Sequence, residues 1–162
     1  MKAGSPFWQF SLAFYRRPPV QAACLAMQDE GGADANMILY LLFAAQEGRA
    51  LAKPSVARMD TFVAQWRDDI VRPLRGVRRV LKSIDFSPAQ EVAALRGRIK
   101  ANELEAERLQ QEAMHDFGRE LDAARMAPAD AAETNLAAYE ACLGCALPSR
   151  AELLREFGTY SG

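Results

Sequence analysis

The strongest constraint on this fold is an uninterrupted apolar run at residues 37–45, MILYLLFAA. Nine residues cannot cross a bilayer as a helix, because a membrane-spanning helix needs about 20. A helix that is apolar on every side must instead be covered by other elements of the protein. We therefore expect residues 37–45 to form the central helix of a folded domain, and we expect no membrane insertion.

The rest of the sequence favours helices. Ala, Leu, Glu, Arg and Gln dominate, and no segment shows the alternation of a half-buried strand. Prolines, glycines and capping residues predict helices at 6–15, 18–31, 35–48, 54–84, 88–126 and 130–143, and a short helix after 149. We predict one all-α domain over residues 1–162, a bundle of about six to eight helices. The long, charged helix 88–126, with Gly118 as a possible break, could project as a helical hairpin around 88–127, or it could pack on its own bundle.

A proline and two serines predict local features of three of these helices. Pro73 lies inside the helix 54–84 and should kink it, because its ring clashes with the carbonyl of Asp69. Ser87 and Ser149 each open a capping-box pattern, in which a serine is followed three places later by Gln or Glu. We expect both serines to cap the helices that follow them.

After Pro73, the predicted helix 54–84 separates its apolar residues from its charges. At 100° per residue, one stripe holds Ile70, Leu74, Val77, Leu81 and Ile84, and another holds Arg72, Arg75, Arg79 and Lys82. No acidic residue occurs from 70 to 84. Such a face suits an anion or an acidic partner helix, or it pairs internally with the acids of the following helix. Nucleic acid is disfavoured, because the net charge is −1 and nucleic-acid-binding domains usually carry a basic surplus.

A polar island, QDEGGADAN at 28–36, separates the second and third predicted helices. Its two glycines permit the left-handed backbone that ends a helix, and Asp34 can cap the next one. Asp29 is harder to explain, because an acid in the last turn faces the negative end of the helix dipole. We expect a cation to compensate Asp29, and Arg75 and Arg79 are the internal candidates.

The polar island and the basic stripe together form the candidate site for a ligand or partner. Its residues are Gln28, Asp29, Asp34, Asn36, Arg72, Arg75, Arg79 and Lys82. The alternative is a purely structural network of arginines and carboxylates. The island's oxygens could hold Mg²⁺ or Ca²⁺, but their spacing is not that of an EF-hand, and we expect no metal.

The helix 88–126 carries a short pattern of the coiled-coil type. Apolar residues recur at alternating spacings of three and four, at Val92, Leu95, Ile99, Ala106 and Leu109, with Asn102 among them. Asn102 would then occupy a core position and could fix the register of the packing. The pattern is compatible with a homo-oligomer formed through the helix 88–126, and equally with packing inside the bundle.

The three cysteines do not indicate a disulfide framework and are compatible with a reducing cytosol. Cys142 and Cys145 form a lone CxxC, and only Cys24 and His115 could complete a zinc site. Nothing in the spacing requires such a site, and we expect buried structural cysteines. A redox pair is disfavoured, because the end of a helix opposes a thiolate.

The first predicted helix is rich in aromatic residues: Phe7, Trp8, Phe10, Phe14 and Tyr15. Aromatic side chains dominate core burial, so core packing is the first interpretation. A ligand pocket lined by the same side chains is the second.

The N-terminal two-thirds of the chain resembles a family of short bacterial proteins known only as a domain of unknown function. The residues that carry the resemblance are Phe7-Trp8, Phe10-Ser11-Leu12, Tyr15, Val20, Ala23-Cys24-Leu25, Gln28-Asp29, Gly32, Asp34, Asn36, Trp66, Pro73-Leu74-Arg75, Arg78-Arg79, Leu81-Lys82 and 103–107. Pro18-Pro19 stands where the family pattern has Pro-Gly, which allows a different turn there. The resemblance implies a small helical, cytoplasmic protein, and it brings no activity, substrate or cofactor.

The function that the sequence favours is a non-enzymatic adaptor or protein-interaction module in the cytoplasm. Its unidentified protein partner would bind the basic face at 72–82 or the long helix. The alternative is a small-molecule or anion-binding protein, or an enzyme, whose polar site joins 28–36 to 72–82. No catalytic or cofactor motif occurs, and we assign neither catalytic residues nor a cofactor.

Overall fold

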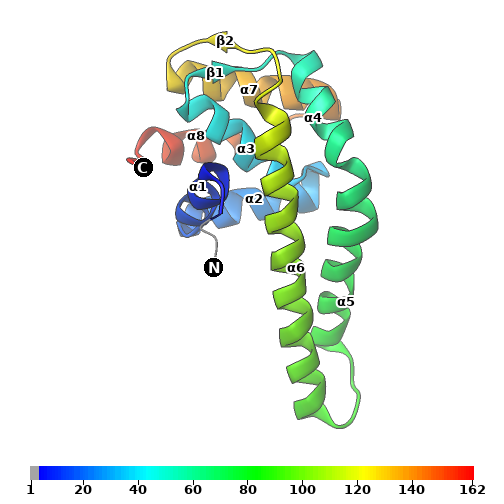
Figure 1. The fold of residues 1–162 in the computed structure, drawn as a ribbon. Helices are drawn as coiled ribbons and strands as arrows, with labels where there is room; N and C mark the ends of the chain where they lie inside the picture. Colours follow the sequence, from blue (N-terminus) through cyan, green and yellow to red (C-terminus); the bar gives the residue numbers. More distant parts are fainter. Residues whose placement is uncertain (1–3) are drawn as a thin grey trace.

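The computed structural model describes residues 4–162 and confirms an all-α bundle. Its elements in chain order are α1 (Pro6–Tyr15), α2 (Pro18–Gly31), α3 (Ala35–Gln46), β1 (Arg49–Ala50), α4 (Lys53–Trp66), the π-helical η1 (Arg67–Val71), α5 (Arg72–Ser83), α6 (Ala89–Gly118), β2 (Ala124–Arg125), α7 (Pro128–Leu143) and α8 (Arg150–Gly158). Figure 1 shows a body of helices from which α5 and the start of α6 extend downward. No helix within residues 4–162 combines the length and the apolar character that a membrane span requires.

The prediction of a central apolar helix is confirmed. Every residue of α3 from 36 to 45 is buried, and α3 contacts α1, α2, α6 and α7. The aromatic residues of α1 divide between two environments: Phe7, Phe10 and Phe14 are buried against α3 and the C-terminal helix, whereas Trp8 and Tyr15 are only partly buried. Core packing is therefore confirmed for Phe7, Phe10 and Phe14, and the ligand-pocket interpretation stays a prediction for Trp8 and Tyr15.

The N-terminal helix boundaries follow the local signals. The Trp8 N–H donates to Ser5 Oγ at 3.1 Å, and the Asn36 N–H donates to Asp34 Oδ1 at 2.8 Å. Gly32 ends α2 with a left-handed backbone at φ 65°. These caps satisfy backbone groups that the helix ends would otherwise leave without partners.

The two predicted capping boxes are wrong. Pro88 occupies the position before α6, so Ser87 lies one residue too early and caps nothing. Ser149 does precede α8, but its backbone is left-handed at φ 58° and its side chain makes no capping hydrogen bond. A capping serine needs an extended backbone to reach the first amides of the helix.

Pro73 interrupts the predicted helix 54–84 as expected, and it does so through a π-helical turn. The Arg72 N–H donates to the carbonyl of Arg67, five residues back, so the turn before Pro73 is wider than an α-helical turn. Proline has no N–H and its ring crowds the preceding turn, and a wider turn relieves that crowding. The chain consequently changes direction between α4 and α5.

The predicted helix 88–126 is too long, because α6 ends at Gly118. A Cβ at residue 118 would lie 1.9 Å from the Tyr40 hydroxyl, so only glycine permits this contact. Arg49 Nη2 donates to the carbonyls of Gly118 at 2.8 Å and Leu121 at 3.1 Å, which satisfies the free carbonyls at the helix end. The chain then pairs β2 antiparallel with β1, a two-residue ladder that the sequence did not predict.

The projecting hairpin consists of α5 and the N-terminal half of α6 (Figure 1). No residue of α5 is buried, whereas α6 buries residues from Glu103 to Gly118 in the body. Asn102 is exposed, so it does not pack inside the bundle of its own chain. The helix is rotated so that Glu103 and Ala106 face inward, because Glu103 binds the arginines of α5.

Candidate functional site

A groove of about 620 Å³ separates the α5–α6 hairpin from α1 and α2, and we refer to it as the groove. Its apolar lining comes from Trp8, Leu12, Tyr15, Leu25, Leu39 and Leu104. Leu12, Leu25 and Leu104 are 40–51% exposed, so the groove leaves apolar surface uncovered. The cations along the groove are Arg16, Arg75, Arg78, Arg79 and Lys100. Apolar walls therefore meet basic edges in one cleft.

The hairpin side of the groove is held by a cluster of ion pairs on α6. Glu103 is 6% exposed and accepts hydrogen bonds from Arg75 Nε at 3.2 Å, from Arg78 Nη2 at 3.2 Å and from Arg78 Nε. Glu107 Oε1 accepts from Arg75 Nη2 at 2.8 Å. Arg75 and Arg78 are thus neutralised within the molecule, and the groove's surplus of positive charge comes from its other cations.

The two glutamates respond differently to this environment. Burial alone would raise the pKa of Glu103, but the hydrogen bonds from Arg78 and Arg75 outweigh it and hold the pKa below its usual range. For Glu107 the balance is reversed: burial raises its pKa, and Arg75 offsets only part of that rise. Glu103 is therefore the residue whose negative charge anchors both arginines at neutral pH.

The floor of the groove is a polar network that joins α1, α3 and α6. Gln111 Nε2 donates to Ser11 Oγ at 2.9 Å and to Asn36 Oδ1 at 2.8 Å. Gln111 Oε1 is buried and has no hydrogen-bond partner among the described residues. A buried acceptor without a donor costs about 1–3 kcal/mol, so an opening of the floor that brought a donor to this oxygen would relieve that cost.

Asp34 lies in the interior of the body and does not line the groove. Its carboxylate accepts from the Asn36 N–H at 2.8 Å and from Gln110 Nε2 at 2.9 Å, and Arg67 Nη1 lies 3.7 Å from it. Its own N–H donates to Tyr139 Oη at 2.9 Å. Asp34 is 7% exposed, and this set of partners ties the α2–α3 turn to α6, α7 and η1. Its role in this structure is to hold the body together.

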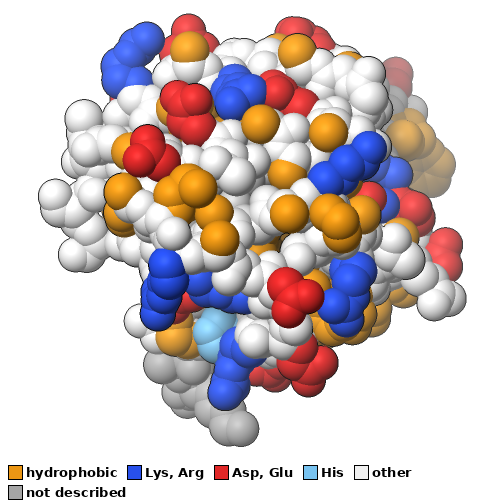
Figure 2. All heavy atoms as spheres, turned by 90° about the horizontal axis from the view of Figure 1, so that it is seen from above, with side chains coloured by type: hydrophobic (Ala, Val, Ile, Leu, Met, Phe, Trp, Pro, Cys, Tyr) orange, Lys and Arg blue, Asp and Glu red, His pale blue; other side chains and the backbone are white. Residues whose placement is uncertain are grey.

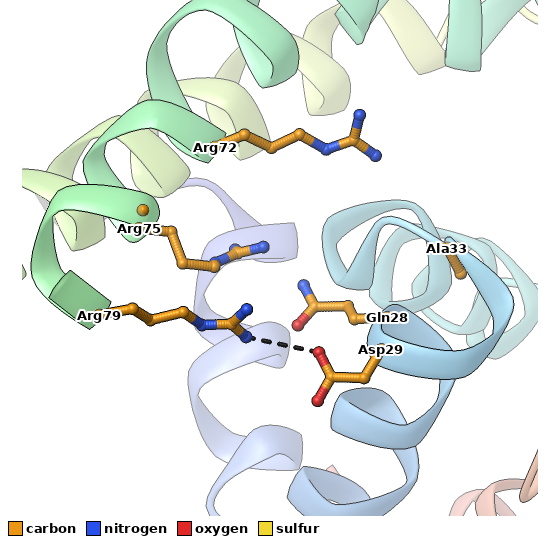
Figure 3. Close-up of a pocket in the computed structure, with 7 residues that line it drawn as sticks. Gln28, Asp29, Ala33, Arg72, Arg75 and Arg79 are labelled. Carbon is orange, nitrogen blue, oxygen red and sulfur yellow. Dashed lines mark hydrogen bonds and ion pairs between the residues drawn. The ribbon is translucent and has the colours of Figure 1, made fainter. Parts of the chain in front are cut away.

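A second, smaller cavity of about 250 Å³ lies between the C-terminal end of α2 and α5, and we refer to it as the turn cavity. Figure 3 shows Arg72, Arg75 and Arg79 reaching from α5 toward α2, where Gln28 and Asp29 point back at them. Arg79 Nη2 lies 3.4 Å from Asp29 Oδ1, and both side chains are more than half exposed. The expected compensation of Asp29 by Arg79 is present, as a weak surface pair.

The three arginines of the turn cavity are already matched by carboxylates. Arg72 Nη1 lies 2.6 Å from Asp68 Oδ1, Arg75 binds Glu103 and Glu107, and Arg79 faces Asp29. A free anion would have to displace one of these pairs. The turn cavity is therefore a weaker anion site than its arginines alone suggest.

The structure brings together five of the eight predicted site residues. Gln28, Asp29, Arg72, Arg75 and Arg79 surround the turn cavity. Asn36 lies on the floor of the groove and Asp34 in the interior. Lys82 is exposed nearer the hairpin tip and lines neither cavity.

The four residues considered for zinc lie on separate parts of the fold. Cys24 is buried in α2, and His115 lies on α6 against the ring of Phe43. Cys142 Sγ lies 3.8 Å from the Lys53 carbonyl, and Cys145 Sγ lies 3.7 Å from the Gly31 carbonyl. Residues 4–162 hold no group of three or more His, Cys, Asp or Glu side chains arranged for a metal.

The expectation of buried cysteines is correct only for Cys24. Cys142 is partly exposed and Cys145 is exposed. Gly144 ends α7 with a left-handed backbone at φ 75°, which turns the chain out of the helix before Cys145.

Figure 2 looks down on the end of the molecule opposite the hairpin tip, where acidic and basic side chains alternate with small hydrophobic areas.

Comparison with known proteins gives one match. The model of a protein family described as "Protein of unknown function (DUF2390)" matches residues 6–114. Neither a curated protein nor a solved structure matched the chain. The matched segment runs from α1 into α6 and therefore includes every element that lines the groove and the turn cavity.

Proposed function

The chain belongs to the DUF2390 family, whose function is unknown, and we propose that it is a protein-interaction module that binds an acidic, amphipathic segment of a partner protein in the groove. The proposed activity is binding, without catalysis. The observation that carries the proposal is the combination of uncovered apolar walls and basic edges in a single cleft.

The dimensions of the groove suit a helical segment. Its lining on α6 runs from Gly97 to Gln111, and fourteen steps along an α-helix correspond to about 21 Å. An amphipathic helix of about four turns would match that length. Its apolar residues at positions i, i+3 or i+4, and i+7 would meet the exposed leucines, as in other complexes of a helix in a groove.

The charges of the groove favour an acidic partner. Arg16 lies at the end of α1 and Lys100 lies on α6, and neither makes an ion pair within the described residues. Arg79 has only its weak surface pair with Asp29. Carboxylates on the flanks of a bound helix would meet these cations, which speeds association and selects the partner more than it adds affinity.

The proposal is tested by site-specific photocrosslinking in the native cell. A photoreactive amino acid replaces Leu25 on one wall of the groove, Leu104 on the other, or the exposed Ala141 of α7 as the control. Positions 25 and 104 should crosslink to the same protein, within an acidic, amphipathic segment, and position 141 should not.

Substitutions then establish whether the groove and its charge are responsible. Lys100→Glu, which reverses a groove cation, should abolish the crosslink from position 25, whereas Lys82→Glu, outside the groove, should leave it intact. The proposal fails if positions 25 and 104 give no common protein adduct, or if Lys100→Glu and Lys82→Glu behave alike.

A second candidate, a small amphipathic molecule with a hydrogen-bond donor, is favoured by one observation. Gln111 Oε1 is a buried acceptor on the groove floor without a protein donor. Native mass spectrometry of the purified protein would reveal such a molecule as a constant added mass. That mass should disappear in Gln111→Leu, and its absence from the wild-type protein would remove this candidate.

A further inference from the structure

We propose that a second copy of this chain docks on the face of the α5–α6 hairpin that lies opposite the groove, giving a two-fold dimer. We call this surface the outer hairpin face. It consists of Ile70 in η1, Val77 on α5 and Ile84 directly after α5, together with Leu95, Asn102 and Leu109 on α6. The five apolar members are 37–48% exposed, and nothing within the described residues covers them.

Both rows of the outer hairpin face have the spacing of a coiled-coil seam. Residues 70, 77 and 84 are seven apart, and so are residues 95, 102 and 109. A repeat of seven keeps side chains on one side of a helix over several turns. The α6 row, Leu95, Asn102 and Leu109, is every second residue of the coiled-coil pattern that the sequence predicts for this helix.

The two rows share the face of the hairpin that points away from the groove. Residues 95, 102 and 109 each lie two positions before a groove residue, namely Gly97, Leu104 and Gln111. Val77 likewise lies two positions before Arg79 of the groove. Two positions correspond to about 200° around an α-helix, so these side chains project on the opposite side. A dimer formed there leaves the groove open.

Ion pairs fix the relative height of the two helices, and the rows match in three layers. Arg78 binds Glu103 and Arg75 binds Glu107, which sets α5 and α6 antiparallel in a defined register. Counting along α5 and α6 from these pairs places Val77 within about 3 Å of the height of Asn102. The chain then continues from Val77 toward Ile84 on the side of Leu95, and back toward Ile70 in η1 on the side of Leu109. The outer hairpin face thus has apolar layers at both ends and a mixed layer in the middle.

That arrangement is complementary to itself. A two-fold axis through the middle layer, perpendicular to the helices, stacks α6 on α6 and α5 on α5 in antiparallel pairs. The tip layer of one copy then meets the base layer of the other, apolar against apolar. Asn102 meets Asn102 of the second copy, and an amide carries both donors and an acceptor, so two such side chains can satisfy each other. A single Asn in a seam is a known means of fixing register.

Charge at the edge of the face supports the same axis. In an antiparallel α6 pair centred on residue 102, Arg98 comes opposite position 106 of the second copy, beside Glu105. By symmetry, Glu105 comes beside Arg98 of the second copy. Arg98 has no ion pair within the described residues, and Glu105 makes only an exposed pair with Arg108, so both are available. A parallel arrangement would set Asn102 against Val77 and leave the amide without a partner.

Disulfide trapping tests the axis directly. In a background with Cys142→Ser and Cys145→Ser, which removes the two accessible thiols, Asn102→Cys should form a covalent dimer under mild oxidation. Leu104→Cys, two positions further on but facing the groove, is the matched control and should remain monomeric. Leu95→Cys and Leu109→Cys should crosslink mainly when the two variants are mixed.

Sedimentation equilibrium on the 162-residue chain, whose mass is 17.9 kDa, tests the association itself. The wild type should approach twice that mass as its concentration rises. Val77→Glu should raise the dimer dissociation constant at least about tenfold, because it buries like charges at the centre of the interface. Leu104→Glu should change it by less than about twofold. Arg98→Glu should weaken the dimer, and the double variant Arg98→Glu/Glu105→Arg should restore it.

Several results would overturn the proposal. These are a monomer at every concentration, a dimer that Val77→Glu leaves unchanged, and trapping at position 104 in place of 102. A monomer that loses some other protein from its complexes in Val77→Glu would show that a different partner covers this face, and the proposal would equally fail.

Discussion

Glu103→Gln is the substitution that most directly tests how the hairpin is attached to the body. Glu103 is 6% exposed and receives hydrogen bonds from both Arg75 and Arg78. Removing one member of a buried ion pair costs about 3–5 kcal/mol, because the remaining charge is left without a partner. Arg78 is about one-quarter exposed and Arg75 keeps Glu107, so water and the second glutamate reduce the cost. We expect a loss of about 2–3 kcal/mol.

Urea denaturation followed by circular dichroism at 222 nm measures this loss. For a chain of this length, it corresponds to a fall in melting temperature of about 4–12 °C. The matched control is Glu105→Gln, two positions along the same helix. Glu105 is 55% exposed and within its own chain pairs only with Arg108 three residues later, so at concentrations where the protein is monomeric this variant should be indistinguishable from the wild type.

Hydrogen exchange locates the effect. No residue of α5 is fully buried, and the pairs of Arg75 and Arg78 with Glu103 and Glu107 are ionic contacts that tie this helix to α6. Amides of α5 should exchange faster in Glu103→Gln, while those of the central α3 remain protected. If Glu103→Gln and Glu105→Gln lose the same small amount of stability, the argument that these ion pairs hold the hairpin is refuted.

Four further outcomes follow from the structure. The pKa of Glu103 is lowered in the folded state, so its ionised form stabilises the fold. This contribution to the free energy of unfolding is complete above about pH 5 and is lost as the pH falls through the folded pKa. In urea titrations, the difference in stability between wild type and Glu103→Gln should therefore shrink from pH 7 to pH 3. Asp29→Asn should change the free energy of unfolding by about 0.5 kcal/mol or less, because its pair is exposed, and a loss above about 1.5 kcal/mol would contradict this. Gly118→Ala should destabilise the protein by at least about 2 kcal/mol, since the new methyl group would collide with Tyr40; an unchanged melting temperature would argue against that contact. Asn135→Ala should lower the free energy of unfolding by about 3 kcal/mol or more, because this fully buried amide makes hydrogen bonds to three backbone groups. A melting temperature close to that of the wild type would contradict this estimate.

Features that depend on neighbouring residues were predictable from the sequence. The cap at Asp34, the left-handed Gly32 and the interruption at Pro73 each arise from the chemistry of a few adjacent residues. The central position of α3 also follows locally, because an apolar helix leaves no alternative to complete burial. The approach of the island to the basic helix was expected from a charge argument, and the turn cavity shows the two together.

Features that depend on packing between distant segments were not predictable in the same way. Asn102 and Glu103 are adjacent, and the hydrophobic pattern places Asn102 in the core, yet Glu103 is the residue that is buried. The rotation is set by two arginines more than 20 residues away, and no local periodicity encodes that. The same holds for Gln110, Gln111 and Tyr139, which complete polar networks with Asp34 and Asn36. The one available signal was the pair Gln110-Gln111, at helical spacing from the apolar Ala106 and Met114 on the long helix.

The position of Asp29 at the acidic end of α2 now has a quantitative account. A carboxylate in the last turn costs a few tenths to about 1 kcal/mol against the helix dipole. An exposed pair with an arginine contributes about 0.2–1 kcal/mol, and Arg79 supplies one at 3.4 Å. The two terms nearly cancel, so Asp29 does little for stability. Its pair with Arg79 nevertheless connects α2 to α5 across the turn cavity, and both helices also line the groove. Asp29 should therefore affect the distance between α2 and α5, and with it the width of the groove that is available to a bound segment.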